Sequence, residues 1–307
     1  MSNRGFNLQH PSQSRQGFGL VVLATLGWSL SGLFVRLLPN LDGWQISCWR
    51  GFWLAVTLLI YLTLRHRSGL PDVFRQVPLP AMIISAVCFA IGTICYVASL
   101  TITNTATVST IGATSPLITA LLSYWVIGEK PSALNWLAGV LAIVGMVVIV
   151  WHGYAEHNIL GIVLALGVPI TFALQTLLLR LYRHFDMMTA ICLGGFLGFV
   201  IAGVASITVS KNSAFMLTSH DMGLLLVMGV VQLGLPLILY GWGAKSVPAV
   251  MLAIITMLDA VFNPFWSWAF ANELPDLDTL IGGSIILAAV VVSIATSRYS
   301  PPDTPHA

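Results

Sequence analysis

One carboxylate lies unusually deep inside an apolar stretch of this chain. Asp259 is flanked by Leu258 and Ala260, near the middle of a helix expected over 247–270. If that helix crosses a bilayer, an ionisable group at its centre costs at least about 2.5 kcal/mol unless it faces a cavity or a partner. It would then contact a cationic substrate group, serve as a proton-coupling carboxylate, or bond to a neighbouring helix. We favour the first two roles, because acids inside membranes are rare without a function.

Arg50 is the second charged candidate. It follows Cys48 and Trp49 in a helix expected over 44–64, about six residues and so about 9 Å from the helix start. From that depth the side chain could reach the membrane surface as an anchor or donate to a neighbouring helix. Its planar guanidinium is also suited to a substrate carboxylate. Both interpretations remain open from the sequence.

Aromatic, amide and hydroxyl side chains complete the candidate site. Hydroxyl groups in membrane helices usually bond to backbone or neighbouring helices, whereas amides are costly to bury, so we expect Gln175, Gln232 and Asn263 to line water. Apolar and aromatic walls with a few placed polar groups suit small amphipathic ligands. The candidate substrate-binding residues are Trp28, Arg50, Tyr96, Gln175, Gln232, Tyr240, Thr256, Asp259 and Asn263.

Cysteine and histidine give no sign of redox or metal chemistry. The cysteines lie in apolar stretches without a Cys-x-x-Cys pair, and no His-x-x-His or His-Glu-x-x-His spacing occurs. We expect ordinary buried thiols at Cys48, Cys88, Cys95 and Cys192, and neither a metal ion nor a cofactor.

Composition places these residues in a membrane protein. Of the 307 residues 57% are hydrophobic and 8% charged, with a mean hydropathy of +0.89, whereas soluble domains carry about 25% charged residues. The uncharged run from Gln76 to Gly128 is long enough for more than one span of about 20 residues. A β-barrel is disfavoured because its strands would alternate polar and apolar residues. The expected partners are a small-molecule substrate and the lipid bilayer, with no nucleic acid.

Turn residues divide the apolar runs into ten expected helices. Most breaks contain Pro, Gly or Asn, as in the segments 39–43 and 272–275. The connections are short, so no soluble domain is expected between the spans. The helices are predicted at 17–38, 44–64, 80–100, 105–127, 132–151, 159–182, 187–209, 222–242, 247–270 and 278–297. Prolines interrupt four of them, at Pro116, Pro169, Pro236 and Pro264.

The two halves of the chain resemble each other without a gap. Scarce residue types coincide at a constant offset of 144 positions, which is hard to obtain by chance in so apolar a sequence. A five-span unit has an odd number of crossings, so its second copy must enter from the opposite face. We therefore predict an all-α, polytopic membrane protein with ten transmembrane helices in two inverted five-helix repeats. The matched pairs are Arg36 with Arg180, Asp42 with Asp186, Tyr96 with Tyr240, Glu129 with Glu273, Pro131 with Pro275 and Gly139 with Gly283.

Basic residues orient the predicted bundle. With both termini inside, ten of the thirteen Lys and Arg residues lie in cytoplasmic segments, while the outer loops hold only Arg36 and Lys211. This predicts cytoplasmic tails at 1–16 and 298–307, repeats at 17–151 and 159–297, and a multi-pass protein of the plasma (inner) membrane. The net charge of +2 reflects this topology rather than nucleic-acid binding.

A motif at the end of each fourth span resembles a known family. Gly128-Glu129-Lys130-Pro131, followed by Gly139 and Gly145, is similar to the hallmark segment of the EamA domain in the drug/metabolite transporter superfamily. The second half repeats it as Asn272-Glu273-Leu274-Pro275 with Gly283. Trp28 and Arg50 match further points of the pattern. The resemblance covers residues 17–297 and implies a ten-helix bundle with peripheral fifth and tenth helices around a central cavity. It also implies movement of small metabolites, often amino acids and often outward, without ATP.

The two copies differ in their deep polar groups, so we expect an asymmetric site. A Glu before the proline of the fourth span is common in the family, and this chain has Ser115 there in the first copy and Asp259 in the second. Phe172 stands where the first copy has Trp28, and Gly194 where it has Arg50.

Competing functions lack their sequence features. A membrane enzyme would need a nucleophile with a base or a metal cluster, and a channel would need a filter-like loop or rings of charge. No Gly-x-x-x-x-Gly-Lys phosphate loop appears, so direct use of ATP is not expected. The sequence favours a secondary carrier, most simply an exporter of an amino acid or related amphipathic solute. An uptake carrier for a vitamin, nucleoside or nucleotide-like metabolite, or a non-transporting receptor or structural protein, remains an alternative.

Overall fold

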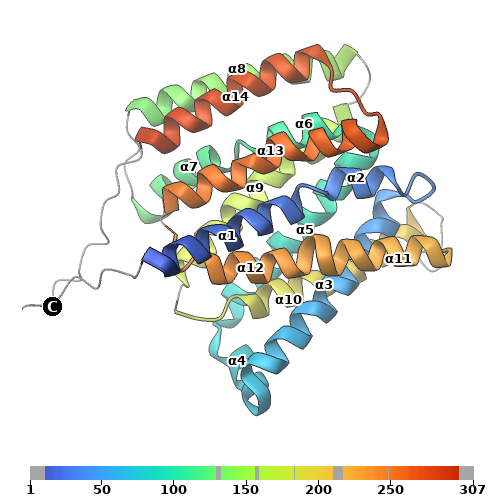
Figure 1. Ribbon diagram of the computed structural model, residues 1–307, viewed down its shortest axis with the longest axis vertical. Coiled ribbons are helices and arrows are strands. Elements are labelled where there is room, and N and C mark those ends of the chain that lie inside the picture. Colours follow the sequence, from blue (N-terminus) through green and yellow to red (C-terminus); the bar gives the residue numbers. More distant parts are fainter. Residues whose placement is uncertain are drawn as a thin grey trace, which may run out of the picture.

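The computed structural model describes residues 11–128, 133–155, 159–182, 184–209, 217–247 and 249–296, and all regular structure in these ranges is helical (Figure 1). The fold class predicted from the sequence, all-α, is confirmed. The helices are α1 (Pro11–Trp28), α2 (Ser31–Arg36), α3 (Gly43–His66), α4 (Leu70–Gln76), α5 (Leu79–Ile102), α6 (Thr105–Gly112), α7 (Ser115–Ile127), α8 (Ala133–Ala155), α9 (Ile159–Leu181), α10 (Met188–Thr208), α11 (Ser219–Val227), α12 (Leu235–Gly243), α13 (Ala249–Ala271) and α14 (Leu277–Thr296), with a 3-10 turn η1 (Arg67–Gly69) and a π-helical turn η2 (Met228–Gly234).

Long apolar helices dominate the fold. Within the described residues, seven helical segments are long and apolar enough to cross a membrane, and two more are apolar but shorter. Three expected spans are interrupted: α1 and α2 form the first, α6 and α7 the fourth, and α11, η2 and α12 the eighth. The short helix α4 follows η1 in the connection between α3 and α5, outside the ten spans expected from the sequence.

Helices pair across the two halves in a reciprocal pattern. The second spans, α3 and α10, pack together, and so do the fifth spans, α8 and α14. The first span of each half packs on the third span of the other, α1 on α12 and α9 on α5. A two-fold axis relating the halves produces this pairing, and α3 and α10 run antiparallel, because Cys48 lies against Gly203 while Ala55 lies against Cys192. The inverted five-helix repeats are confirmed.

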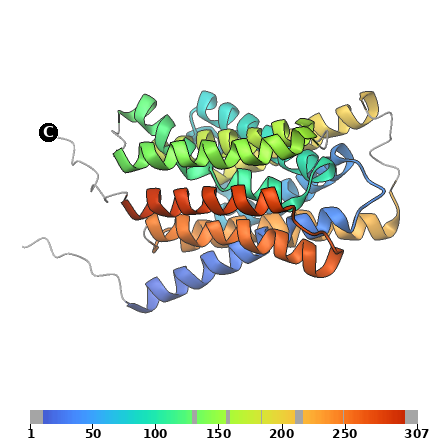
Figure 2. The same ribbon diagram turned by 90° about the horizontal axis from the view of Figure 1, so that it is seen from above.

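The two ends of the bundle are distinct. Helix α1 begins and α14 ends at the same end, on the left of Figures 1 and 2, which we call the near end. The opposite end, where α2 ends and α3 begins, is the far end. An even number of crossings places the start of α1 and the end of α14 on one side of the bundle, as observed.

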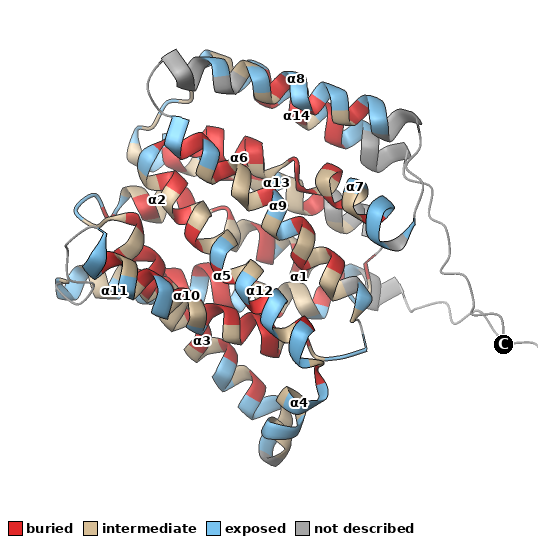
Figure 3. Ribbon diagram, turned by 180° about the vertical axis from the view of Figure 1, so that it is seen from behind, coloured by how far each residue is buried: buried red, intermediate tan, exposed pale blue. Residues whose placement is uncertain are grey.

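Helices α8 and α14 lie side by side at one edge of the bundle, at the top of Figure 3. Their contact is close because Gly145 has no side chain: a Cβ there would stand 2.7 Å from the Gly282 carbonyl oxygen. Their outer faces are exposed, with Trp136 and Ile143 both more than half exposed. This edge position agrees with the peripheral fifth and tenth helices that the family resemblance implies.

Local sequence explains where several helices begin and end. Asp42 caps α3, accepting the Gln45 N–H at 2.8 Å, and the matched Asp186 accepts the Met188 N–H at the start of α10. The fourth span of each half ends at a left-handed residue, Gly128 with φ 79° and Asn272 with φ 55°. Glycine and asparagine are the residues that favour this helix end, which explains the first position of the repeated Gly/Asn-Glu-x-Pro motif.

The positions of the prolines predict only some of the helix breaks. Pro116 lies in the first turn of α7 and Pro236 in the first turn of α12, where the preceding helix has broken or widened. Pro169 and Pro264 instead lie inside α9 and α13, which remain continuous. The break between α1 and α2 carries no proline and was not predicted.

Candidate functional site

The break in the first span exposes backbone groups at the middle of the bundle. In a continuous helix the Gly32 N–H would donate to the Trp28 carbonyl oxygen four residues earlier. Here the Gly32 N–H donates to Asn263 Oδ1 at 2.8 Å, and the Trp28 oxygen accepts from Gln232 Nε2 at 3.0 Å. Two amides of the second repeat therefore satisfy the broken helix of the first. Unwound helices of this kind form binding sites where two transporter repeats meet.

Asn263 also joins a small polar cluster. Its Nδ2 donates to the Tyr96 hydroxyl at 2.7 Å and to Ser31 Oγ at 3.2 Å, and the two hydroxyls bond to each other. Asn263 and Gln232 are 0% and 1% exposed. Both amides were expected to line water, and both are instead buried against protein, because the helix break supplies partners that the sequence does not reveal.

Arg50 lies in the interior and does not reach the membrane surface. Its side chain is 4% exposed, and its Nε donates to Gln232 Oε1 at 3.3 Å. The guanidinium carbon lies 5.9 Å from the centre of the Tyr96 ring, a cation–π contact. Among the described residues its two terminal nitrogens make no hydrogen bond. The surface-anchor interpretation is therefore wrong, because Gln232 and Tyr96 hold the group inside.

Asp259 lies halfway along α13, and one of its carboxylate oxygens lacks a hydrogen-bond partner among the described residues. Its Oδ1 is buried and, within the described part of the chain, has no hydrogen-bond partner. The Tyr96 phenol lies within electrostatic range of both Asp259 and Arg50. The two opposite charges do not pair with each other in the described structure, although unpaired buried charges are costly.

Two aromatic rings pack together beside the break in the first span. The Trp28 ring lies 5.3 Å from the Tyr240 ring. Trp28 Nε1 is buried without a partner among the described residues. An indole that leaves its donor unused is held by ring packing rather than by a hydrogen bond.

Two expected site residues lie apart from these contacts. Gln175 on α9 accepts from Ser85 on α5 at 3.0 Å, and its Nε2 is buried without a partner in the described ranges. The Thr256 hydroxyl donates to Leu252 of its own helix. In the parts of the chain that the structure describes, no three His, Cys, Asp or Glu side chains gather closely enough to hold a metal ion.

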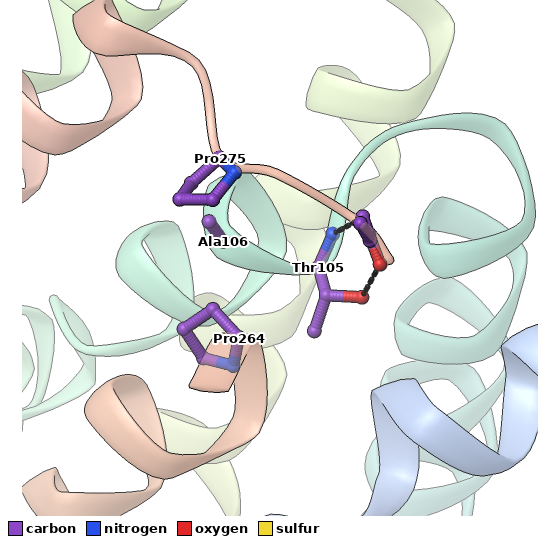
Figure 4. Close-up of a pocket in the computed structure, with 5 residues that line it drawn as sticks. Thr105, Ala106, Pro264 and Pro275 are labelled. Atoms are coloured by element: carbon purple, nitrogen blue, oxygen red, sulfur yellow. Dashed lines mark hydrogen bonds between the residues drawn. The ribbon is translucent and has the colours of Figure 1, made fainter. Parts of the chain in front are cut away.

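An ionic cluster at the far end was missed by sequence reasoning. Arg36 binds Glu273 through two 2.8 Å hydrogen bonds, from Nε and Nη2, and Nη2 also donates to the Thr103 carbonyl. The Thr105 N–H and hydroxyl donate to the same carboxylate, drawn as dashed lines beside the labelled Thr105 in Figure 4. We call Arg36, Thr105 and Glu273 the far-end cluster. The sequence did contain a signal for this cluster, because Arg36 and Glu273 each belong to a matched pair of the repeat.

The pKa of Glu273 shows that the far-end cluster stabilises its charged form. Burial alone would raise the pKa of Glu273, but the hydrogen bonds and charge of Arg36 and the two bonds from Thr105 outweigh it, so the pKa lies below the usual value of a glutamate. The carboxylate is therefore held charged between the ends of α2 and α13.

The near end has a looser contact between the repeats. Asp186, which follows α9, lies 3.2 Å from Arg65 and 3.1 Å from His66 at the end of α3. Arg65 is 40% exposed, so solvent screens this contact more than the far-end cluster. The described residues thus carry ionic contacts between the repeats at both ends of the bundle.

Comparison with known proteins agrees with this architecture. Residues 15–151 and 159–295 each match the EamA-like transporter family. The chain is 27% identical to the pseudopaline exporter CntI of Pseudomonas aeruginosa, over 92% of this chain and 96% of that protein. It is 22% identical to an S-adenosylmethionine uptake transporter of Rickettsia bellii, over 92% and 94% of the two chains.

A solved crystal structure shares the fold. It superposes with a TM-score of 0.66 at 14% identity and covers 94% of this chain and 97% of its own. The two family matches account for both halves of the inverted repeat, and the family consists of transporters rather than enzymes. This chain therefore belongs to the EamA-like transporter family, as a multi-pass membrane protein and secondary transporter.

Proposed function

We propose that this protein exports an amino acid or a related amphipathic solute by alternating access, without ATP. The observation that carries this proposal is the interrupted first span, whose freed backbone groups are bonded by Gln232 and Asn263 of the other repeat. A site built at the repeat interface can be presented to either side when the repeats rock against each other.

The side chains around the break suit an amphipathic solute. Trp28 and Tyr240 offer aromatic surface, while Arg50 and Asp259 offer charges of opposite sign that the described structure leaves without ionic partners. Apolar walls with a few convergent polar groups are typical of small-molecule sites. A solute carrying both an apolar body and charged groups would satisfy all four residues.

The relatives support a small charged metabolite but differ in direction. The more similar one is named for pseudopaline export, which favours outward movement here. The other is named for uptake of S-adenosylmethionine, a nucleoside-bearing derivative of the amino acid methionine. Uptake of a nucleotide-like metabolite is therefore the second candidate function.

The basic residues support an orientation with both termini in the cytoplasm of a plasma (inner) membrane, so that the far-end cluster faces outward. Impermeant thiol labelling of single cysteines tests it, with Ser219→Cys at the far end and Asp72→Cys at the near end, both at exposed positions. Intact cells should label the Ser219 position alone. Labelling of the Asp72 position instead would reverse the orientation.

Flux into proteoliposomes tests the function. Purified protein is reconstituted and offered the radiolabelled protein amino acids, S-adenosylmethionine and nucleosides, with empty liposomes as control. We expect saturable flux of at least one amino-acid-like solute, and faster efflux from cells that express the protein. Binding without flux would identify a receptor, and flux of nucleosides alone would favour the second candidate.

A further inference from the structure

A small pocket beside Arg50 is left open by the packing of α3, α5, α10 and η2. Its cavity volume is about 10 Å³, and it is lined by Ser47, Arg50, Gly51, Leu54, Thr93, Gly195 and Leu233. A cavity needs about 10–15 Å³ to hold one water molecule. In this closed arrangement the pocket therefore has room for about one water-sized group, and a larger group enters it only as the repeats move.

Two polar side chains of the pocket, Arg50 and Ser47, are donors without enough acceptors in the part of the chain that the structure describes. Arg50 is 4% exposed and uses only Nε in a hydrogen bond among the described residues. Ser47 lies one helical turn earlier on α3, is 6% exposed, and its buried Oγ has no partner within the described structure. The terminal nitrogens of a buried arginine and a buried hydroxyl on the same helix face thus lack an acceptor among the described residues, and each unmade bond costs free energy.

Two glycines that line the pocket allow close backbone packing of α3 on α10. A Cβ on Gly51 would lie 2.8 Å from the Gly195 carbonyl oxygen, and one on Gly195 would lie 3.1 Å from the Gly51 oxygen. Larger residues at these positions would push α3 and α10 apart. The glycines thus fix the helix spacing next to the arginine.

The pocket belongs to one half of the repeat only. Residues 144 positions after Ser47, Arg50 and Thr93 are Ile191, Gly194 and Leu237, none of which offers a side-chain hydrogen bond. Packing of the inverted repeat as such does not require polar groups here, because the equivalent positions in the second copy are apolar or glycine.

We propose that Arg50 and Ser47 form a carboxylate subsite, which binds the acid group of the transported solute at the contact of α3 with α10. The proposal rests on the proposed function and adds to it the chemical class of the solute. A carboxylate offers two acceptor oxygens in one plane, which match the free edge of the guanidinium, and it can also accept the Ser47 hydroxyl. The Tyr96 ring contact and the bond from Nε to Gln232 hold the guanidinium in place.

Flux measurements with paired probes test the subsite. Proteoliposomes containing wild type, Arg50→Gln, Arg50→Lys or Ser47→Ala are offered the protein amino acids, their amides and S-adenosylmethionine. We expect wild type to move acids at least about tenfold faster than the matching amides, the difference that one charged hydrogen bond supplies. Arg50→Gln should abolish this discrimination, Arg50→Lys should retain part of it, and Ser47→Ala should raise KM for the acid several-fold.

Ser47→Ala removes an oxygen that has no partner among the described residues, so it should fold normally even if changes at Arg50 disturb folding. Ser123→Ala is its matched control, because Ser123 is also buried with an unpartnered Oγ but lies on α7, outside the pocket. It should leave KM unchanged.

The outcomes separate the two proposals. Saturable flux with equal rates for acids and amides in wild type, or unchanged discrimination in Arg50→Gln and unchanged KM in Ser47→Ala, would overturn the subsite while the transport function stands. Absence of saturable flux for every probe would overturn the proposed function and the subsite with it.

Discussion

The far-end cluster and the middle of the bundle use charge in opposite ways. At the far end, Arg36 and Glu273 face each other through two hydrogen bonds, and Thr105 supplies two more to the carboxylate. In the middle, Arg50 and Asp259 are as deeply placed but keep free hydrogen-bonding atoms in the described structure. Charges that pair with each other hold helices together, whereas charges without an ionic partner are available to a ligand.

The far-end cluster and the contacts of Arg50 join the two repeats at different levels of the bundle. Arg36 and Glu273 lie 237 residues apart, one in each repeat, so their contact joins the two halves at the far end. Arg50 meets Gln232, which also belongs to the other repeat, beside the broken first span. The cluster at the end should therefore affect stability most, and the groups in the middle should affect transport most.

The largest expected effect is on transport, from Asp259→Asn. This change keeps size but removes the titratable charge, so we expect flux to fall by about tenfold or more, the worth of one charged contact, or the pH profile of flux to flatten. Flux over a range of pH at equal membrane abundance measures it. Wild-type rates with an unchanged pH profile would show that Asp259 has only a structural role. The middle of the bundle would then not differ from the far-end cluster in this respect.

The next effect is on stability, from Glu273→Gln. Loss of the charge weakens hydrogen bonds that are worth about 1.5–3 kcal/mol each to a charged group, so the melting temperature in detergent should fall by several degrees. Asp221→Asn is the control: this carboxylate lies in an exposed cap at the same end, where it meets Thr218. Equal melting temperatures for the two variants would show that the far-end cluster adds nothing beyond an ordinary cap.

The contribution of Glu273 to stability should depend on pH. Because the pKa of Glu273 is lowered in the folded protein, its contribution is present above the usual glutamate pKa of about 4.3 and is lost as the pH falls through the lowered value. Wild type and Glu273→Gln should therefore differ most in melting temperature near neutral pH and converge in acid. A difference that grows on acidification would contradict the assignment.

The smallest effect is expected at Trp28. Phenylalanine stands at the equivalent position of the second repeat, as Phe172, and the Trp28 indole donor is unused. Trp28→Phe should thus leave flux nearly unchanged, while Trp28→Ala loses a ring contact worth about 0.5–1.5 kcal/mol and should raise KM by about two- to tenfold. If the alanine variant transports like wild type, the aromatic wall does not contact the solute.

Several features of the fold follow directly from the residues. Low charge and long apolar runs predict a membrane bundle, and the constant offset between Arg36 and Arg180 or Asp42 and Asp186 predicts the repeat. Turn and cap chemistry locates most helix ends, because these signals act over a few residues. The break after Trp28 was not predicted, since what stabilises it is Gln232 and Asn263, more than 200 residues away.

The sequence by itself therefore determined the class, the inverted repeat and the types of polar residue buried in the membrane. Only the tertiary structure decided their pairing: Arg36 with Glu273, Arg50 with Gln232, and Asp259 with no hydrogen-bond partner for its buried oxygen among the described residues. The physical reason is that hydropathy and helix caps depend on near neighbours in the chain. A buried hydrogen bond depends on which atoms of distant helices come within about 3 Å of one another.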